Sequence, residues 1–368
     1  MNPLPEIIRR EIATNGAVPF ARFMELALYC PQLGYYERKQ DAVGRRGDFY
    51  TSASVGPLFG ELLAFQFAEW LDAEVQEVQE VQSPKSKVQI VEAGAHDGKL
   101  AADILNWTRA NRPELFARLE YLILEPSPQR QQWQRETLVK FAPHVRWSNL
   151  QPSTLNLQPF DGILFCNELL DAFPVHRLGW DALAEKWFEW GVAVEGERFV
   201  WAKLSTFNFQ LSTSELESVL PDGYTIEVCP AAAAWWREAA GALRCGKLVA
   251  IDYGLTADEL FRPERSGGTL RGYRHHHASD DLLANPGEQD LTAHVNFSAI
   301  QQAGEVAGLQ TERLVSQPKF LTDIAARLWK NPAAFGGWTP AQTRQFQTLT
   351  HPQHLGRAFR VLVQSRPQ

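Results

Sequence analysis

Carboxylate and amide side chains directly follow several short apolar segments of this 368-residue chain. Glu92 ends the first of these segments and precedes the turn Gly94–Gly98, and Glu125 ends the second. Asn167–Asp171 and Asp252 follow two more. Ligands of an open parallel sheet bind beyond the carboxyl ends of its strands, so these residues are the first candidates for a site. An acid at each of these positions favours a ligand with positive charge over a phosphate.

The glycine turn discriminates between nucleotide cofactors. A nicotinamide dinucleotide needs a GxGxxG turn whose backbone N–H groups hold a pyrophosphate at a helix N-terminus. Here the turn is GxxxG, and Glu92 stands where it would face that pyrophosphate. S-adenosylmethionine instead carries an ammonium, a sulfonium and a ribose diol, whose two hydroxyls Glu125 can bind as an acceptor. The pattern therefore predicts S-adenosylmethionine, held by Glu92, Gly94, Gly98 and Glu125.

The acidic end of the fourth apolar segment has two interpretations. Asn167 and Glu168 could cap the segment that follows them. Asp171 lies three residues after Glu168, however, and this spacing would place both carboxylates on one side of a helical turn. We favour the second interpretation, in which Asn167, Glu168 and Asp171 are catalytic or substrate-binding residues.

Composition limits the class of protein. Hydrophobic residues make up 45% and charged residues 21% of the chain, as in ordinary globular proteins. The net charge of −7 opposes binding to a phosphate backbone, so nucleic acid is not an expected partner. The four cysteines are far apart without a CxxC pair, which favours a reducing compartment. No export signal and no apolar run of membrane-spanning length is present, so we expect a cytoplasmic protein without membrane insertion.

The candidate residues require a framework that brings strand ends together. Predicted strands alternate with predicted helices from Lys87 onward, which is typical of a doubly wound, Rossmann-like α/β sheet. The predicted strands are Val88–Ala93, Leu119–Glu125, Val145–Trp147, Asp161–Cys166 and Lys247–Tyr253, followed by an antiparallel edge strand at Gly356–Gln364. The predicted helices include Phe20–Tyr29, Leu58–Leu71, Ser127–Phe141, Ala231–Leu243 and Phe297–Ala307.

Two regions lie outside this framework. Residues 1–86 are predicted to form an N-terminal helical cap and linker, with no strand, before a core of residues 87–368. Insertions are predicted at about 180–228 and 255–295. The first contains two aromatic-rich runs around Glu195–Glu197, which indicate a hairpin. The second has little periodicity, and so long a loop is usually functional.

Several ordered motifs resemble those of the MidA-like methyltransferases, a family that includes a mitochondrial assembly factor of respiratory complex I. The resemblance runs from about Pro19 to Val363. Its motifs are Arg22–Pro31, Gly34–Tyr36, Gly47–Ser52, Leu124–Pro128, Asn167–Val175, Asp252–Gly254, Thr269–Arg274 and Asp290–Val295. The resemblance implies a class I methyltransferase fold, S-adenosylmethionine as cofactor and an arginine side chain of a partner protein as substrate, possible partners including a subunit of a respiratory complex.

The same resemblance implies further site residues. Asp48, Phe49, Thr51 and Ser52 are expected near the cofactor, as are Pro126, Ser127 and Asn167. His276 is expected near the reaction centre. An arginine substrate would also explain the paired acids, because a planar, always protonated guanidinium binds carboxylates through parallel N–H groups.

Departures from the family pattern leave alternatives open. His96 stands where the family usually has a second glycine, a position that would require a positive φ. A protein that binds the cofactor without turnover, as an assembly factor or chaperone, is therefore one alternative, and a small-molecule methyltransferase is another. His275, His276 and His277 resemble a metal-binding tract, but consecutive residues cannot all face one ion, so no metal site is predicted.

Overall fold

The computed structural model describes residues 2–38, 51–77, 87–149, 157–204, 220–274, 277–279, 281–330, 337–356 and 358–366. Its helices are α1 (Leu4–Asn15), α2 (Phe20–Tyr29), α3 (Tyr35–Arg38), α4 (Leu58–Glu77), α5 (Lys99–Asn111), α6 (Pro113–Arg118), α7 (Pro128–Thr137), α8 (Pro230–Ala242), α9 (Ala257–Leu260), α10 (Phe297–Val306), α11 (Gln317–Trp329) and α13 (Pro340–Thr350). Short 3₁₀ turns include η1 (Val139–Phe141) and η2 (Leu170–Ala172).

A large central sheet contains β2 (Val88–Ala93), β3 (Leu119–Leu124), β4 (Val145–Ser148), β5 (Phe160–Asn167), β10 (Leu243–Leu255), β15 (Gln310–Ser316) and β16 (Phe359–Arg366), in the order β15-β16-β10-β5-β2-β3-β4. Strands β4, β3, β2, β5 and β10 are parallel to one another, and β16 is antiparallel to its two neighbours, β10 and β15. A further short strand, β14 (Val295–Asn296), pairs with β10. This is the doubly wound, Rossmann-like α/β sheet that the sequence predicted.

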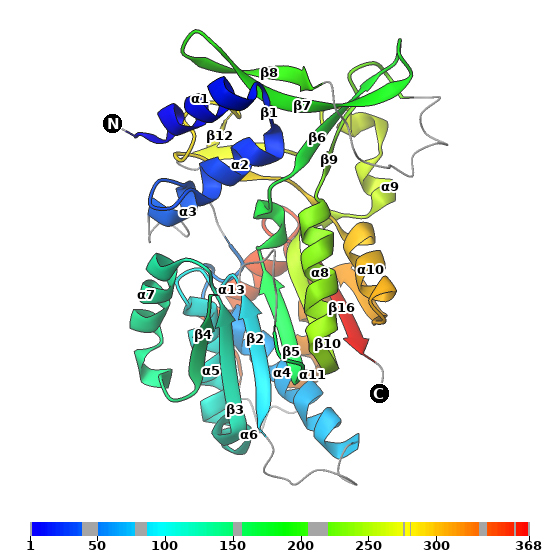
Figure 1. The fold of residues 1–368 in the computed structure, drawn as a ribbon. Helices are drawn as coiled ribbons and strands as arrows, with labels where there is room; N and C mark the ends of the chain where they lie inside the picture. Colours follow the sequence, from blue (N-terminus) through cyan, green and yellow to red (C-terminus); the bar gives the residue numbers. More distant parts are fainter. Residues whose placement is uncertain are drawn as a thin grey trace.

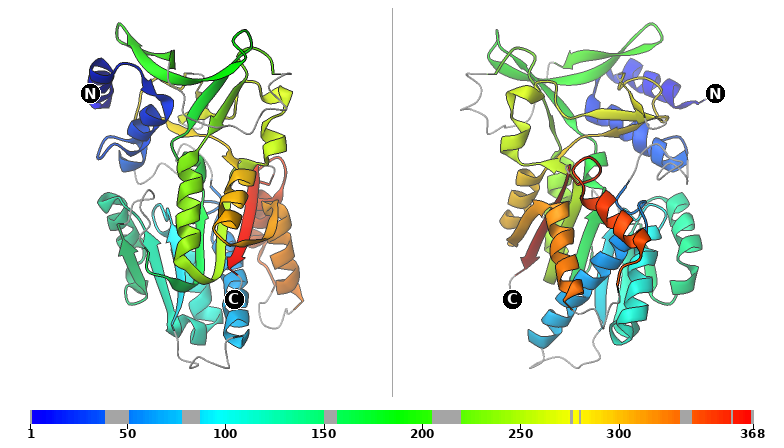
Figure 2. Two further views of the ribbon diagram at one scale, coloured as in Figure 1. Left: turned by 45° about the vertical axis from the view of Figure 1, so that its right-hand side comes forward. Right: turned by 180° about the vertical axis from the view of Figure 1, so that it is seen from behind.

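Side chains alternate between the two faces of the central sheet because successive residues of a strand point in opposite directions. On β10, Val249 and Ile251 pack with α4, α5 and α11, whereas Leu248 and Ala250 pack with α8 and α10. Figure 2 shows the two groups of helices on opposite sides of the sheet. Because both faces are covered, the central strands are apolar almost throughout, as parallel strands usually are.

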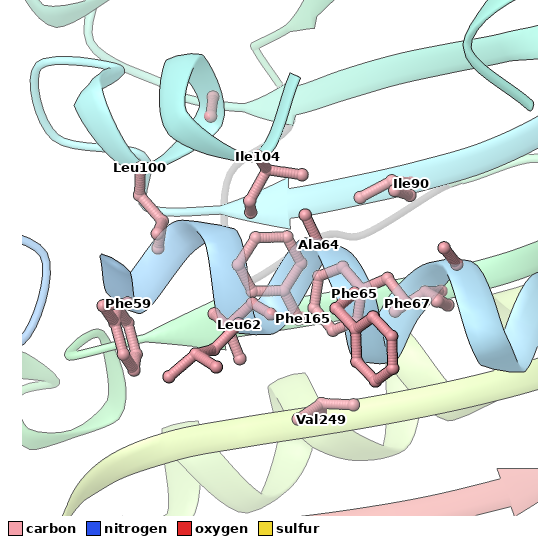
Figure 3. Close-up of a cluster of buried hydrophobic side chains, with 14 of the residues drawn as sticks. Phe59, Leu62, Ala64, Phe65, Phe67, Ile90, Leu100, Ile104, Phe165 and Val249 are labelled. Carbon is pink, nitrogen blue, oxygen red and sulfur yellow. The ribbon is translucent and has the colours of Figure 1, made fainter. Parts of the chain in front are cut away.

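Helix α4 lies within this core and not on the surface. Leu58, Phe59, Leu62, Phe65 and Phe67 are all buried, on several sides of the helix. Figure 3 shows Phe59, Leu62, Phe65 and Phe67 of α4 together with side chains of α5 and of the strands β2, β5 and β10. A helix that is apolar around most of its circumference must be enclosed by other elements. This part of the predicted cap therefore packs into the core.

A second sheet lies above the carboxyl ends of the parallel strands (Figure 1). It contains β1 (Val18–Pro19), β6 (His176–Asp181), β7 (Lys186–Glu195), β8 (Arg198–Leu204) and β9 (Thr225–Val228), all joined in antiparallel pairs. Strands β7 and β8 form the predicted hairpin, with Glu195 opposite Arg198. The expectation of an N-terminal region without strands was wrong, because β1 pairs with β7. The predicted domain boundary at residue 86 stays a prediction.

Two other expectations are corrected by the structure. Strand β16 is not at the edge of the sheet, because β15 pairs with its outer side. The segment after β10 is not a plain loop: it contains β11 (Arg271–Arg274), β12 (His277–Ser279) and β13 (Asp290–Thr292), which form a small antiparallel sheet. Strands this short carry too little periodicity to be recognised in a sequence.

Candidate active site

A pocket of about 650 Å³ lies at the carboxyl ends of β2 and β5. Strand β3 lies on one side of β2 and β5 lies on its other side, so the strand order reverses at this point. Ligands of open α/β sheets bind at such a reversal. The volume is within the range of small-molecule sites. The lining residues include Glu92, Gly94, His96, Asn167, Glu168, Asp171 and Tyr253 from the central sheet, Thr269, Arg271, Tyr273, Asp290 and His294 from the second insertion, and Tyr36 from α3.

The turn after β2 has an unusual backbone. Gly94, His96 and Gly98 have φ values of 77°, 47° and 81°. The positive φ at His96 was expected, because the family usually has glycine at this position. A residue with a side chain adopts positive φ only at a cost in free energy. A Cβ atom at Gly94 would lie 2.8 Å from Leu169 Cδ1, so a larger residue would have to displace that side chain.

Glu92 is buried at the end of β2, with 2% of its surface exposed, and its carboxylate reaches the pocket. The hydroxyl of Tyr121 on β3 donates a 2.7 Å hydrogen bond to Glu92 Oε2. Burial raises the pKa of Glu92 to about 8, although the Tyr121 bond acts in the opposite direction. A cation in the pocket would favour the charged form of this acid.

Glu125 is 1% exposed at the end of β3 and is held by three partners. It accepts hydrogen bonds from the backbone N–H of Ser127 at 3.0 Å and from Gln134 Nε2 at 3.1 Å, and it pairs with Arg130 at 2.9 Å. Burial raises its pKa despite these contacts. Glu125, Pro126 and Ser127 are not among the residues that line the 650 Å³ pocket.

Asn167 is the last residue of β5 and Glu168 follows it, and both line the pocket. Glu168 Oε1 accepts hydrogen bonds from the backbone N–H of Ser52 at 2.8 Å and from Asn167 Nδ2 at 3.1 Å. Glu168 Oε2 and Asn167 Oδ1 are buried and have no hydrogen-bond partner among the described residues. Burial raises the pKa of Glu168 to about 8. These two oxygens are acceptors available to a ligand.

Glu168 and Asp171 reach the same pocket by a route that differs from the prediction. Glu168 has φ 51° and therefore lies outside any helix, and the 3₁₀ turn η2 begins only at Leu170. The predicted helical turn with both acids on one side is therefore wrong. Asp252, on β10, fixes the actual turn: its carboxylate accepts the backbone N–H groups of Leu169 and Leu170 at 3.1 and 2.8 Å.

Asp171 and Asp252 are both buried beside other acids. Burial and the charges of Asp252, Asp290 and Glu168 raise the pKa of Asp171 well above its usual range. Burial raises the pKa of Asp252 to about 7. Acids this close together and this buried are stable as anions only when a cation balances them.

Several pocket residues were missed as site residues although they lie in the quoted motifs, and they include Tyr36, Asp290 and His294. Asp290, on β13, is 1% exposed and accepts a 2.7 Å hydrogen bond from the hydroxyl of Tyr36. Burial of His294, together with the positive charges of Arg265 and Arg271, lowers its pKa to about 4, so its ring is neutral at pH 7. Proximity of β13 to the β5 turn follows from a backbone bond, in which Ala293 N–H donates to the Asp171 carbonyl at 3.0 Å. Such long-range pairing leaves no local signal.

The remaining predicted residues have mixed outcomes. Thr51 lines the pocket, and Ser52 contributes its backbone N–H to Glu168. Asp48, Phe49 and His276 lie outside the described residues. Asn296 caps α10 by accepting the N–H of Ala299. Within the described ranges, no group of three or more His, Cys, Asp or Glu side chains is arranged to hold a metal ion.

Comparison with known proteins identifies what this architecture resembles. Residues 67–315 match the family model described as "Putative S-adenosyl-L-methionine-dependent methyltransferase". A crystal structure of a protein from Burkholderia thailandensis, bound to S-adenosyl-homocysteine, aligns with a TM-score of 0.83 and 34% identity, over 99% of this chain and 92% of that one. A native crystal structure of a protein from the same organism aligns with a TM-score of 0.78 and 33% identity, over 99% and 91% of the two chains.

Two curated relatives carry a functional name. The Drosophila melanogaster "Protein arginine methyltransferase NDUFAF7 homolog, mitochondrial" is 29% identical, over 98% of this chain and 84% of the relative. The human "Protein arginine methyltransferase NDUFAF7, mitochondrial" is 27% identical, over 97% of this chain and 83% of the relative. The family and cofactor inferred from the motifs are thereby confirmed.

The predicted cytoplasmic location is contradicted by these names, which are those of mitochondrial proteins. Cysteine spacing indicates only a reducing environment, which the cytoplasm shares with other compartments, so it was a poor basis for that prediction. None of the helices in the described part of the chain is both long and apolar enough to span a membrane.

Proposed function

Because the chain belongs to this family of S-adenosylmethionine-dependent methyltransferases, we propose that it transfers the methyl group to an arginine side chain of a partner protein. The observation that carries the proposal is the acidic pocket, in which Glu168 and Asp171 from the central sheet meet Asp290 from the second insertion. A guanidinium fits such a pocket because it stays protonated and presents several N–H donors in one plane. The names of the curated relatives support the same substrate class.

The residues around the pocket also suit the cofactor. Glu92 and the Gly94–Gly98 turn are proposed to hold its amino-acid end, and Glu125 its ribose hydroxyls. The groups proposed to hold it are carboxylates and the unpaired oxygen of Asn167, which as acceptors match an ammonium and a diol and do not match a pyrophosphate. When bound, the cofactor supplies an electrophilic methyl group on a sulfonium.

Transfer of a methyl group to a guanidinium releases one proton from the accepting nitrogen. Glu168 is proposed to orient that nitrogen and to receive the proton on Oε2, the buried oxygen that has no partner. Asp171 and Asp290 would hold the rest of the guanidinium. A proton acceptor works best with a pKa near the working pH, and burial places the pKa of Glu168 at about 8.

The test is transfer of a tritiated methyl group from S-adenosylmethionine to the proteins of a cell lysate by the purified chain. Acid hydrolysis of the labelled band is expected to release labelled methylarginine. Label in methyllysine or in small molecules would contradict the proposal, as would cofactor binding with no transfer at all. A subunit of a respiratory complex is the proposed identity of the labelled protein, because of the resemblance to the MidA-like family.

A further inference from the structure

Gln134, on α7, lies between two proposed cofactor contacts that come from different strands. Its side chain is completely buried. Gln134 Nε2 donates to the backbone carbonyl of His96 at 3.0 Å and to Glu125 Oε2 at 3.1 Å. One amide nitrogen therefore connects the turn after β2 to the acid at the end of β3.

The other end of the amide is fixed as well. Gln134 Oε1 accepts a 3.0 Å hydrogen bond from Trp147 Nε1 on β4. The Trp147 ring is held in turn by the guanidinium of Arg135, 4.8 Å from the ring centre. With the oxygen occupied by a donor, the nitrogen must point toward His96 and Glu125, so the orientation of the amide is determined.

A second, independent contact joins the same residue to the same turn. A Cβ atom at Gly98 would lie 3.3 Å from Gln134 Cα and 3.2 Å from Leu138 Cδ1. The turn therefore rests on the backbone of α7 at Gln134, and glycine allows the close approach. The positive φ at His96 is held by the same contacts, because its carbonyl is the acceptor of the Gln134 bond.

We propose that Gln134 is a positioning residue for S-adenosylmethionine, which sets the distance between the His96 turn and Glu125 so that one cofactor contacts both. The inference rests on the cofactor contacts proposed above. Gln134 itself does not line the pocket and acts through its two partners. Removing its donors leaves a buried carbonyl and a buried carboxylate oxygen without partners, and it releases both elements.

The test compares the affinity for S-adenosyl-homocysteine of three variants by calorimetry. Gln134→Glu keeps the size and the acceptor for Trp147 but replaces the N–H donors, and it is expected to weaken binding about 10- to 100-fold. The matched control is Gln131→Glu, one turn earlier on α7, where a similarly buried amide donates to the Glu125 backbone carbonyl at 2.7 Å. Trp147→Phe removes the donor that fixes the orientation of the Gln134 amide, and it is expected to weaken binding less than Gln134→Glu does. The Gln131→Glu control is expected to change affinity less than threefold.

Thermal unfolding of each variant separates loss of fold from loss of positioning. Equal weakening by all three variants, or unchanged affinity in Gln134→Glu, would overturn the proposal. A double-mutant cycle with Glu125→Gln gives a further readout: the two changes are expected to be non-additive if Gln134 acts through Glu125. Unchanged affinity in Glu125→Gln alone would refute the ribose contact, and strictly additive effects would refute the connection through Gln134.

Discussion

Tyr36, on α3, donates a 2.7 Å hydrogen bond to the carboxylate of Asp290 on β13, and both side chains line the pocket. The residues are 254 positions apart in the chain. Tyr36 is thus positioned to orient an acid that the second insertion adds to those of the central sheet. Its hydroxyl donates to Asp290 Oδ1 and thereby fixes the orientation of the carboxylate.

Tyr36→Phe is therefore expected to raise the KM for the methyl-accepting protein about three- to tenfold, with the cofactor affinity unchanged. This change corresponds to the net contribution of about one hydrogen bond, roughly 0.7–1.4 kcal/mol. Tyr29→Phe is the matched control, because the Tyr29 hydroxyl donates to the Ala172 carbonyl at 2.9 Å and does not line the pocket. Initial-rate kinetics on both variants decide the point, and an equal change in the two would remove Tyr36 from the substrate site.

Stability should depend on pH through the buried acids. Burial raises the pKa of Glu168 to about 8 in the folded protein, whereas the unfolded chain titrates near the ordinary value of 4.5. Between these values the folded state holds a proton that the unfolded state has lost, so this acid lowers the free energy of unfolding as pH rises toward 8.

Glu168→Gln is expected to remove this loss. The variant should match wild type near pH 4.5 and exceed it by about 1–3 kcal/mol at pH 8, since one pKa unit corresponds to about 1.4 kcal/mol. Urea unfolding at pH 5, 6.5 and 8 measures the difference in stability between the two proteins. The opposite pH effect of ion-paired acids such as Glu11, whose pKa is lowered, is present in both proteins and cancels in this difference. A variant less stable than wild type at pH 8 would show that Glu168 is stabilising as an anion.

Glu125→Ala is expected to weaken binding of S-adenosyl-homocysteine by about 1–3 kcal/mol, because the ribose hydroxyls would lose their acceptor. The substitution also leaves Arg130 without its 2.9 Å partner, so Glu125→Gln, which retains an acceptor oxygen, should be weakened less. Calorimetry on both variants is the measurement. Wild-type affinity in the alanine variant would exclude Glu125 from the cofactor site.

His96→Gly is expected to tighten cofactor binding. The residue has φ 47°, and glycine adopts this conformation without the cost of about 1 kcal/mol that a side chain imposes. The greater entropy that glycine loses on ordering offsets part of the gain, so the change should not exceed about fivefold. Weaker binding in the variant would instead identify the imidazole, which lines the pocket, as a ligand contact.

Local patterns predicted the framework well because they depend on neighbouring residues. The β2 strand was predicted at Val88–Ala93, where the structure has it. Strand β15 was not predicted, because Gln310–Ser316 has few apolar residues. Polar residues are common in a strand at the edge of a sheet, which is where β15 lies. Because β15 was missed, β16 was wrongly predicted to lie at the edge of the sheet.

The site was predictable where it depends on strand ends and not where it depends on contacts between distant segments. Glu92, Asn167, Glu168 and Asp171 all line the pocket. The left-handed backbone of Glu168 could not be inferred from spacing, because it depends on Asp252 holding the following N–H groups. Asp290 enters the site through pairing of the insertion with the β5 turn, which no periodicity reveals.

The account depends most on the claim that Glu168 and Asp171 bind the arginine and not the cofactor. The decisive measurement is methyl incorporation into protein arginine by Glu168→Gln and Asp171→Asn, alongside calorimetry with S-adenosyl-homocysteine. We expect cofactor affinity within about 1 kcal/mol of wild type and at least 100-fold slower transfer, because displacement of the accepting nitrogen by ~1 Å costs about that much in rate. Normal transfer rates in both variants would contradict the account, and loss of cofactor binding in both would assign these acids to the cofactor.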